Sequence, residues 1–147
     1  MKAEEALRKV SLFEGLSKHH IKTLSRACKE RSFESGDYVV RQGNPGIGLF
    51  IITEGQVRGE KRSEDGTEIH LATHGPGEVV GEMSVIDGAT RSASVIAEEP
   101  TRCLVLPSWA FNSFLEEHPT VAVHILPVVV RRFRETNEAL IGLQHGG

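Results

Sequence analysis

The hydrophobic and polar positions follow three successive patterns along the chain. Between Ser17 and Cys28 apolar residues recur at helical spacing, and Ser17 is placed to cap that helix. From Phe33 to Leu106 short apolar runs alternate with glycine turns about every ten residues, which is typical of an antiparallel sandwich or barrel. After Pro107 the helical spacing returns. The pattern therefore predicts helices, then a β domain, then helices.

The expected fold class is mainly β with flanking helices. The apolar runs between turns predict strands at residues 38–40, 49–53, 56–58, 69–72, 94–97 and 103–106. We expect a single domain over 1–147. It would comprise N-terminal helices at 1–31, an antiparallel β-roll or jelly-roll barrel at 32–107, and a C-terminal helical pair at 108–147.

The last predicted helix carries a long apolar stripe. Its members recur at alternating steps of four and three: Leu126, Val130, Phe133, Asn137 and Leu140. This spacing suits a coiled-coil seam in a homodimer or with an effector partner, and equally a helix packed on its own β domain. Both interpretations remain open. Pro127 removes a backbone donor and crowds the preceding turn, so we expect a kink or break there.

Composition and charge narrow the possible functions. The chain has 147 residues, of which 39% are hydrophobic and 25% are charged, as in one ordinary domain. Seventeen basic and 20 acidic residues give a net charge of −3, which is unfavourable for sequence-independent nucleic-acid binding. No apolar signal segment or membrane span is present, so we expect a cytoplasmic protein. Cys28 and Cys103 match no metal-site spacing and are predicted to be buried thiols.

The segment 81–93, GEMSVIDGATRSA, combines residue types that suit a sugar phosphate. Gly81 permits close approach of a ligand, and a short helix starting near Ser84 would present unpaired amides to an anion. Arg91 offers a planar fork to two phosphate oxygens, and Ser92 adds a donor. Glu82 is an acceptor for a ribose hydroxyl. On spacing alone, a Glu82–Arg91 ion pair closing the loop is the simpler interpretation.

The order of the surrounding motifs reverses that preference. Along the chain come Phe33-x-x-Gly36-Asp37, Gln42-Gly43, Leu49-Phe50-Ile51-Ile52 with Gly55, Gly75-Pro76-Gly77-Glu78-Val79-Val80-Gly81-Glu82-Met83-Ser84, and Arg91-Ser92-Ala93-Ser94-Val95. Together they resemble the cyclic-nucleotide-binding domain family, and most closely the sensor domain of bacterial catabolite-activator-type regulators. The resemblance covers about residues 10 to 140.

The resemblance implies a role for each matching residue. Arg91 would neutralise the cyclic phosphate, and Glu82 would accept a hydrogen bond from the ribose 2′-hydroxyl. The remaining ligand-binding residues implied are Gly81, Met83, Ser84, Ser92 and Ala93 in the cassette, Val57, Leu71 and Val79 as an apolar wall for the base, and Arg132 and Thr136, with Asn137 beside them, on the last helix. The ligand would be cyclic AMP, with cyclic GMP as the other possibility, and its binding would be relayed through the last helix.

Two departures and three alternatives accompany this interpretation. Val79-Val80 stands where the family often has aromatic residues, and the sequence leaves no room for a helix-turn-helix domain, so we expect no direct nucleic-acid binding. A degenerate interaction module of the same fold is disfavoured because Glu82, Arg91 and Ser92 are retained, and a cyclic dinucleotide remains a possible ligand.

The third alternative is a cupin-type metalloenzyme with His70, His74 and Glu78 as ligands. It is disfavoured because two histidines four residues apart on a strand lie about 13 Å from each other, too far for one metal ion. No nucleophile elbow is present, so neither an enzyme nor a metal site is expected.

Overall fold

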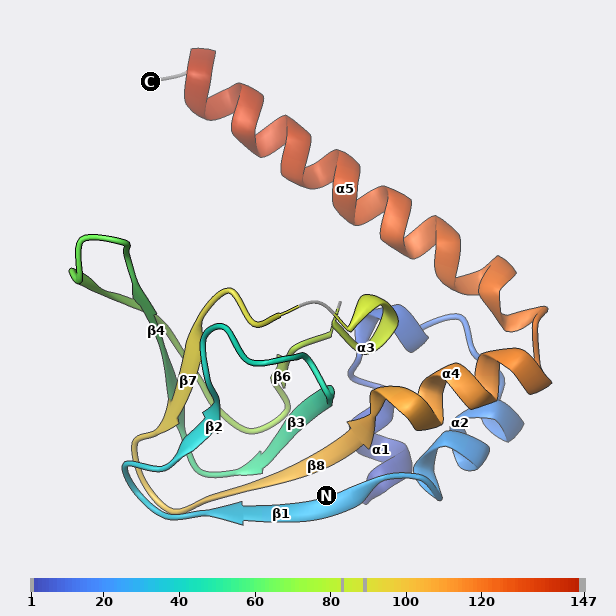
Figure 1. The fold of residues 1–147 in the computed structure, drawn as a ribbon. Coiled ribbons are helices and arrows are strands. Elements are labelled where there is room, and N and C mark those ends of the chain that lie inside the picture. The colour runs from blue at the N-terminus through green and yellow to red at the C-terminus, as the bar shows by residue number, and fades with distance from the viewer. Residues whose placement is uncertain (1, 83, 89, 146–147) are drawn as a thin grey trace.

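The computed structural model describes residues 2–82, 84–88 and 90–145, with strands in the middle of the chain and helices mainly at its two ends (Figure 1). The helical elements are α1 Ala3–Leu7, the 3-10 helix η1 Ser11–Phe13, α2 Lys18–Ser25, α3 Ser84–Asp87, α4 Ser108–Glu117 and α5 Val121–His145. The strands are β1 Lys29–Phe33, β2 Tyr38–Val40, β3 Gly48–Glu54, β4 Val57–Arg62, β5 Glu68–His74, β6 Val79–Val80, β7 Ser94–Ala97 and β8 Thr101–Pro107.

The strands form two four-stranded antiparallel sheets. The first has the order β1-β8-β3-β6 and the second the order β2-β7-β4-β5. The prediction of a mainly β domain with flanking helices is therefore confirmed. The two sheets pack face to face as a roll, and they do not join into one closed barrel.

Alternation along β3 explains how one strand serves two hydrophobic cores. Phe50 and Ile52 face the second sheet, where they pack in a cluster with Val57 of β4. Leu49 and Ile51 point to the opposite face and pack against the N-terminal helices, α4 and the start of α5. Because successive side chains of a strand point to opposite faces, a strand buried on both sides is apolar throughout. The first sheet is thus the middle layer between the second sheet and the helices.

Strand β1 is one of two strands that the apolar pattern did not predict, the other being the two-residue β6. It runs from Lys29 to Phe33 and pairs with β8, with Lys29 opposite Val105 and Phe33 opposite Thr101. Its side chains are exposed apart from the half-buried Phe33, which packs against the cluster between the sheets, because β1 is an edge strand. A polar edge strand has no apolar alternation, although charged edges are a common protection against unwanted strand pairing.

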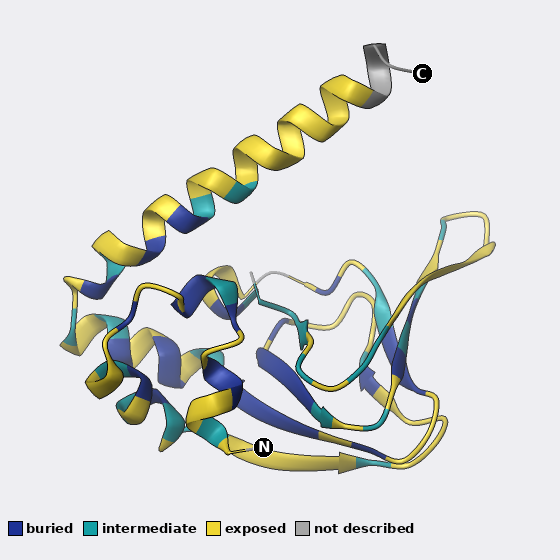
Figure 2. Cartoon of the chain, turned by 180° about the vertical axis from the view of Figure 1, so that it is seen from behind, coloured by how far each residue is buried: buried dark blue, intermediate teal, exposed yellow. Residues whose placement is uncertain are grey.

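The helix α5 runs through Pro127 without interruption, so the predicted break is wrong. Buried Val121, Ile125 and Val128 hold the first turns of α5 to the body of the protein. Pro127 lies on the exposed side, as does Val123, whose carbonyl would have paired with an amide at position 127. Water can solvate that carbonyl, and packing outweighs the lost hydrogen bond. Beyond this region α5 extends away from the sheets and is exposed almost throughout (Figures 1 and 2).

Candidate ligand-binding site

Backbone pairing with the loop before β3 places Arg91 at the end of the roll. The Arg91 amide donates to the Asn44 carbonyl at 2.8 Å, and the Gly43 amide donates to the Arg91 carbonyl at 2.8 Å. An isolated antiparallel bridge between Pro45 and Thr90 continues this pairing. The loop fixes the main chain of Arg91, so the side chain has a defined direction into the interior.

The Arg91 guanidinium is buried without a counter-charge. The residue is only 8% exposed, and its two terminal nitrogens donate to the Ser84 hydroxyl and the Gly48 carbonyl. Its Nε has no hydrogen-bond partner, and no ion pair joins Arg91 to a carboxylate of the described residues. Burial lowers the pKa of Arg91 from its ordinary value, because a charged group loses its hydration there. The site is therefore a desolvated cation with an unsatisfied donor.

Gly81 is required by the position of the guanidinium. Its φ is +78°, and a Cβ at this position would lie 1.9 Å from Nη1 of Arg91. The Ser84 hydroxyl, which accepts from Arg91, itself donates to the Gly81 carbonyl at 2.8 Å. The structure thus brings together three of the predicted cassette residues, whereas Met83 lies outside the described residues.

Glu82 faces away from Arg91 and contacts two distant parts of the chain. Its Oε1 accepts hydrogen bonds from the Ser11 hydroxyl at 2.7 Å and the Leu12 amide at 2.9 Å. Its Oε2 lies 2.6 Å from Nη1 of Arg132 on α5. The loop-closing Glu82–Arg91 ion pair that spacing alone favoured is therefore not formed. Sequence reasoning missed Ser11 and Leu12, and no local signal marks them because they are about 70 positions away.

The three predicted wall residues occupy different environments. Val57 is fully buried in the cluster between the sheets, whereas Val79 is half-buried against the cluster beneath the helices. Leu71 is 45% exposed on the edge strand β5, with its Cβ close to Gly59. In this conformation the three side chains do not line one common surface.

The other predicted contacts lie around the cassette exit and on α5. Ser92 is exposed and Ala93 is half-buried just before β7. On α5, Arg132 is engaged by Glu82 and by the Ser11 hydroxyl at 3.2 Å. The exposed Thr136 donates its hydroxyl to the Arg132 carbonyl one turn earlier, at 3.0 Å. No contact joins these two α5 side chains to Arg91 in the described structure.

Two cavities open at this end of the roll. One of about 190 Å³ is lined by Arg91 together with Val39, Ile47 and Phe50, among others. A larger cavity of about 570 Å³ is lined mainly by polar and charged residues, does not include Arg91, and lies between the end of β2 and the β4–β5 hairpin. Sites for small molecules usually measure about 300–1,000 Å³. The cavity at Arg91 is smaller than this range in the present conformation.

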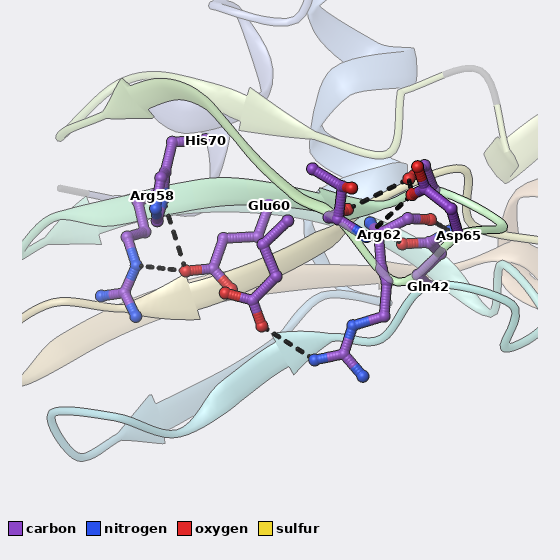
Figure 3. A network of polar contacts seen from close by, with 9 residues as sticks. Gln42, Arg58, Glu60, Arg62, Asp65 and His70 are labelled. Atoms are coloured by element: carbon purple, nitrogen blue, oxygen red, sulfur yellow. Dashed lines mark hydrogen bonds and ion pairs between the residues drawn. The ribbon is translucent and has the colours of Figure 1, made fainter.

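A network of polar contacts braces the β4–β5 hairpin beside these cavities (Figure 3). The Gln42 side chain pairs with the Arg62 backbone as a neighbouring strand would. Its Nε2 donates to the Arg62 carbonyl at 2.9 Å, and its Oε1 accepts from the Arg62 amide at 2.8 Å. Glu60 pairs with Arg58 at 2.9 Å and lies 3.6 Å from Nδ1 of His70. The Gln42 contacts tie the end of β4 to the loop after β2, and the Glu60–His70 contact joins β4 to β5.

Metal chemistry finds no support in this region. His70 approaches Glu60, whereas His74 pairs separately with Glu78 at 2.5 Å. Within the described residues, no group of three or more His, Cys, Asp or Glu side chains could hold a metal ion. Nor does the described part of the chain contain a helix that is long and apolar enough to cross a bilayer.

Comparison with known proteins agrees with the class that the fold and the cassette define, a ligand-binding regulatory domain rather than an enzyme. Residues 30–118 match the family model described as "Cyclic nucleotide-binding domain". The chain belongs to the cyclic-nucleotide-binding domain family.

Relatives with curated descriptions include regulators of transcription. The chain is 31% identical over 140 residues to a CRP-like cAMP-activated global transcriptional regulator of Mycobacterium tuberculosis, covering 95% of this chain and 62% of the relative. It is 33% identical over 126 residues to the cyclic AMP receptor protein of Thermus thermophilus, covering 86% and 58%. The chain thus spans about three fifths of the length of these relatives.

Solved structures show the same fold. The N-terminal domain of a transcriptional regulator from Streptomyces coelicolor has a TM-score of 0.80 and 35% identity, covering 91% of this chain and 96% of that one. The catabolite activator protein of Thermus thermophilus has a TM-score of 0.74 and 33% identity, covering 91% and 63%.

Proposed function

We propose that the protein is a cyclic AMP sensor in which Arg91 binds the cyclic phosphate, Glu82 binds the ribose, and α5 relays occupancy. The observation that carries this proposal is the buried Arg91 guanidinium, which has no counter-charge and an unpaired Nε. A singly charged phosphate would supply both the missing charge and the missing acceptor. Cyclic AMP is favoured over cyclic GMP because two of the relatives are named for their response to it.

Titration calorimetry with cyclic AMP, cyclic GMP and a cyclic dinucleotide tests the ligand. Arg91→Ala should weaken cyclic AMP binding by about 10- to 100-fold, which corresponds to a hydrogen bond to a charged group. Arg102→Ala is the matched control, because Arg102 is an exposed arginine on β8 whose loss should leave affinity unchanged. Absence of binding by the wild-type protein to any of the three nucleotides would favour the non-binding interaction module.

The ribose contact can be tested separately from the phosphate contact. If Glu82 accepts from the 2′-hydroxyl, wild-type protein should bind 2′-deoxy cyclic AMP more weakly than cyclic AMP. Glu82→Gln should discriminate between the two nucleotides less than wild type, because a neutral amide oxygen replaces the charged acceptor. If Glu82→Gln discriminates between them as strongly as wild type, the hydroxyl is recognised elsewhere.

The contacts of Glu82 suggest how binding reaches α5. Oε2 of Glu82 is held by Arg132 of α5 at 2.6 Å, so a ribose hydroxyl bound there would compete with Arg132. Release of Arg132 would free α5 to move, and the extent of that shift is limited by the difference in ligand affinity between the two positions of the helix. We infer that Arg132 is the first residue of α5 to respond to the ligand.

Spin labels at the exposed positions Glu64 and Glu138 would report this movement, in a background with both cysteines replaced by alanine. Cyclic AMP should change the distance between the β4–β5 turn and α5 in the wild-type background. In Arg132→Ala the ligand-free distance should already differ from wild type. Unchanged distances on saturation would refute the relay while leaving the binding proposal intact.

The apolar stripe of α5 supports a contact with a second copy of the chain. Leu126, Val130, Phe133 and Leu140 are all exposed, whereas a separate row at Val121, Ile125 and Val128 faces the body. The stripe is thus free for pairing of two α5 helices. Sedimentation should show a dimer that Phe133→Lys weakens. Trp109→Lys is the control, because Trp109 on α4 is 68% exposed and Phe133 is 66% exposed.

A further inference from the structure

Four histidines from three parts of the sequence lie where α2, the end of α4 and the start of α5 come together. His20 of α2 lies 5.1 Å from His118 at the end of α4 and 5.9 Å from His19, measured between ring centroids. His124 of α5 packs beside the turn that precedes α2, where its Cβ is 3.6 Å from the position of a Cβ on Gly15. We name His19, His20, His118 and His124 the histidine cluster. It contains four of the seven histidines of the chain.

The histidine cluster lies at the attachment point of α5. The His118 carbonyl accepts a hydrogen bond from the Val121 amide at 3.0 Å, which joins the end of α4 to the start of α5. The Phe114 ring lies 5.0 Å from the ring of His118 and meets the ring of His20 edge-on at 5.6 Å. A change of charge in this group therefore acts directly where α5 leaves the body.

Three members of the histidine cluster lie at the N-terminal ends of helices. His19 and His20 lie in the first turn of α2, and His124 lies in the first turn of α5. Positive charge is disfavoured at a helix N-terminus, and neither helix has an acidic residue in its first turn to offset it. His118 is the C-cap of α4. A proton on His20 would thus add positive charge at the N-terminus of α2, with the ring of His118 5.1 Å away.

The charged groups around His20 also disfavour its protonation. Desolvation, followed by the charges of His118, His19 and His124, lowers the pKa of His20 from its ordinary value. Lys18 on α2 adds a further positive charge in the same turn. The carboxylates nearest in sequence, Glu116 and Glu117 of α4, are both exposed to solvent.

We propose that the histidine cluster is an acid-sensitive switch that loosens the attachment of α5 to α2 and α4 when it is protonated. A histidine with a lowered pKa in the folded state stabilises the fold above its ordinary pKa of about 6.5. That contribution is lost as the pH falls toward the lowered value. Below about pH 6.5 the positions of α5 in which the four rings are separated therefore gain population. This switch acts without any nucleotide.

Amide hydrogen exchange, measured by NMR and corrected for intrinsic rates, tests the switch. Between about pH 7.5 and 5.5, protection of the Ile125 and Val128 amides should fall relative to the amides of β3. The protection factor should fall by up to about tenfold for each unit by which the pKa of His20 lies below its ordinary value. Side-chain NMR should show His20 titrating below its ordinary value. Unchanged relative protection in wild type, or an ordinary or raised His20 pKa, would overturn the proposal.

Variants locate the effect. In His20→Asn/His118→Asn the relative protection of α5 should no longer depend on pH, whereas His70→Asn, which removes an exposed histidine from β5, should behave as wild type. An equal pH response in the double variant would refute the assignment. Should the double variant fail to fold, His124→Asn changes an exposed position and should still reduce the pH response. A full response in that variant would count against the cluster.

Discussion

Replacement of Arg91 by methionine gives a sharp test of the idea that this arginine serves a ligand and not the fold. The unfolding free energy of the ligand-free variant depends on terms of opposite sign. Arg91→Met loses two hydrogen bonds to a charged group, each worth about 1.5–3 kcal/mol, and leaves the Gly48 carbonyl without that donor. It also removes an unpaired buried Nε, worth about 1–3 kcal/mol, and a desolvation penalty of several kcal/mol.

These contributions nearly cancel, so the ligand-free variant should unfold within about 1 kcal/mol of wild type. With cyclic AMP at about 100 times the wild-type Kd, wild type should gain about 2.7 kcal/mol, whereas a variant that binds about 10- to 100-fold more weakly should gain only about 0.4–1.4 kcal/mol. Urea unfolding followed by circular dichroism, with and without the nucleotide, measures both differences. A loss of more than about 3 kcal/mol in the ligand-free variant would show that Arg91 is a structural residue, and the reasoning would fail.

Three further predictions follow from local geometry. Gly81→Ala should lower the unfolding free energy by about 1–2 kcal/mol, because φ at this position is positive. It should also impair nucleotide binding, because the added Cβ would collide with Nη1 of Arg91. Thermal unfolding measures the first effect and calorimetry the second. Hydrogen bonds from Ser63 and Thr67 lower the pKa of Asp65 to about 2. The contribution of the Asp65 carboxylate to folding stability is therefore present above about pH 4 and is lost as the pH falls through about 2. Acid unfolding curves of wild type and Asp65→Asn should converge at low pH. Burial raises the pKa of Cys28 to about 12 and that of Cys103 to about 11, so neither thiol should react with a disulfide reagent at neutral pH until urea is added.

The cassette could be predicted from the sequence because its determinants are local. Gly81, Ser84 and Arg91 lie within one loop and one short helix, and the structure brings the three into contact. The central strands could also be predicted from the sequence, since β3 and β8 are apolar runs bounded by turns. What a pattern reports is the burial of consecutive residues, so it finds the strands that build the core.

Features that depend on distant contacts were beyond the reach of the sequence. The partners of Glu82 come from η1 and α5, and the histidine cluster is assembled from three helices. Helical spacing gave two possible uses for the apolar stripe of α5, and only the structure shows that a different row faces the body. Pro127 was predicted to interrupt the helix because its cost is local, whereas the packing that offsets this cost is not.

Arg91 and Glu82 stand in opposite situations, and this difference suggests separate roles for the phosphate and the ribose. Arg91 has an unpaired donor and no anion, so a phosphate arriving there displaces no charged partner. Glu82 already has Arg132 as a cationic partner, so a ribose hydroxyl must compete for its oxygen. A ligand shifts a helix only through interactions that differ between its two positions. We therefore expect 2′-deoxy cyclic AMP to bind through its phosphate but to move the α5 spin label less than cyclic AMP at equal saturation. Equal movement would place the coupling at Arg91 instead.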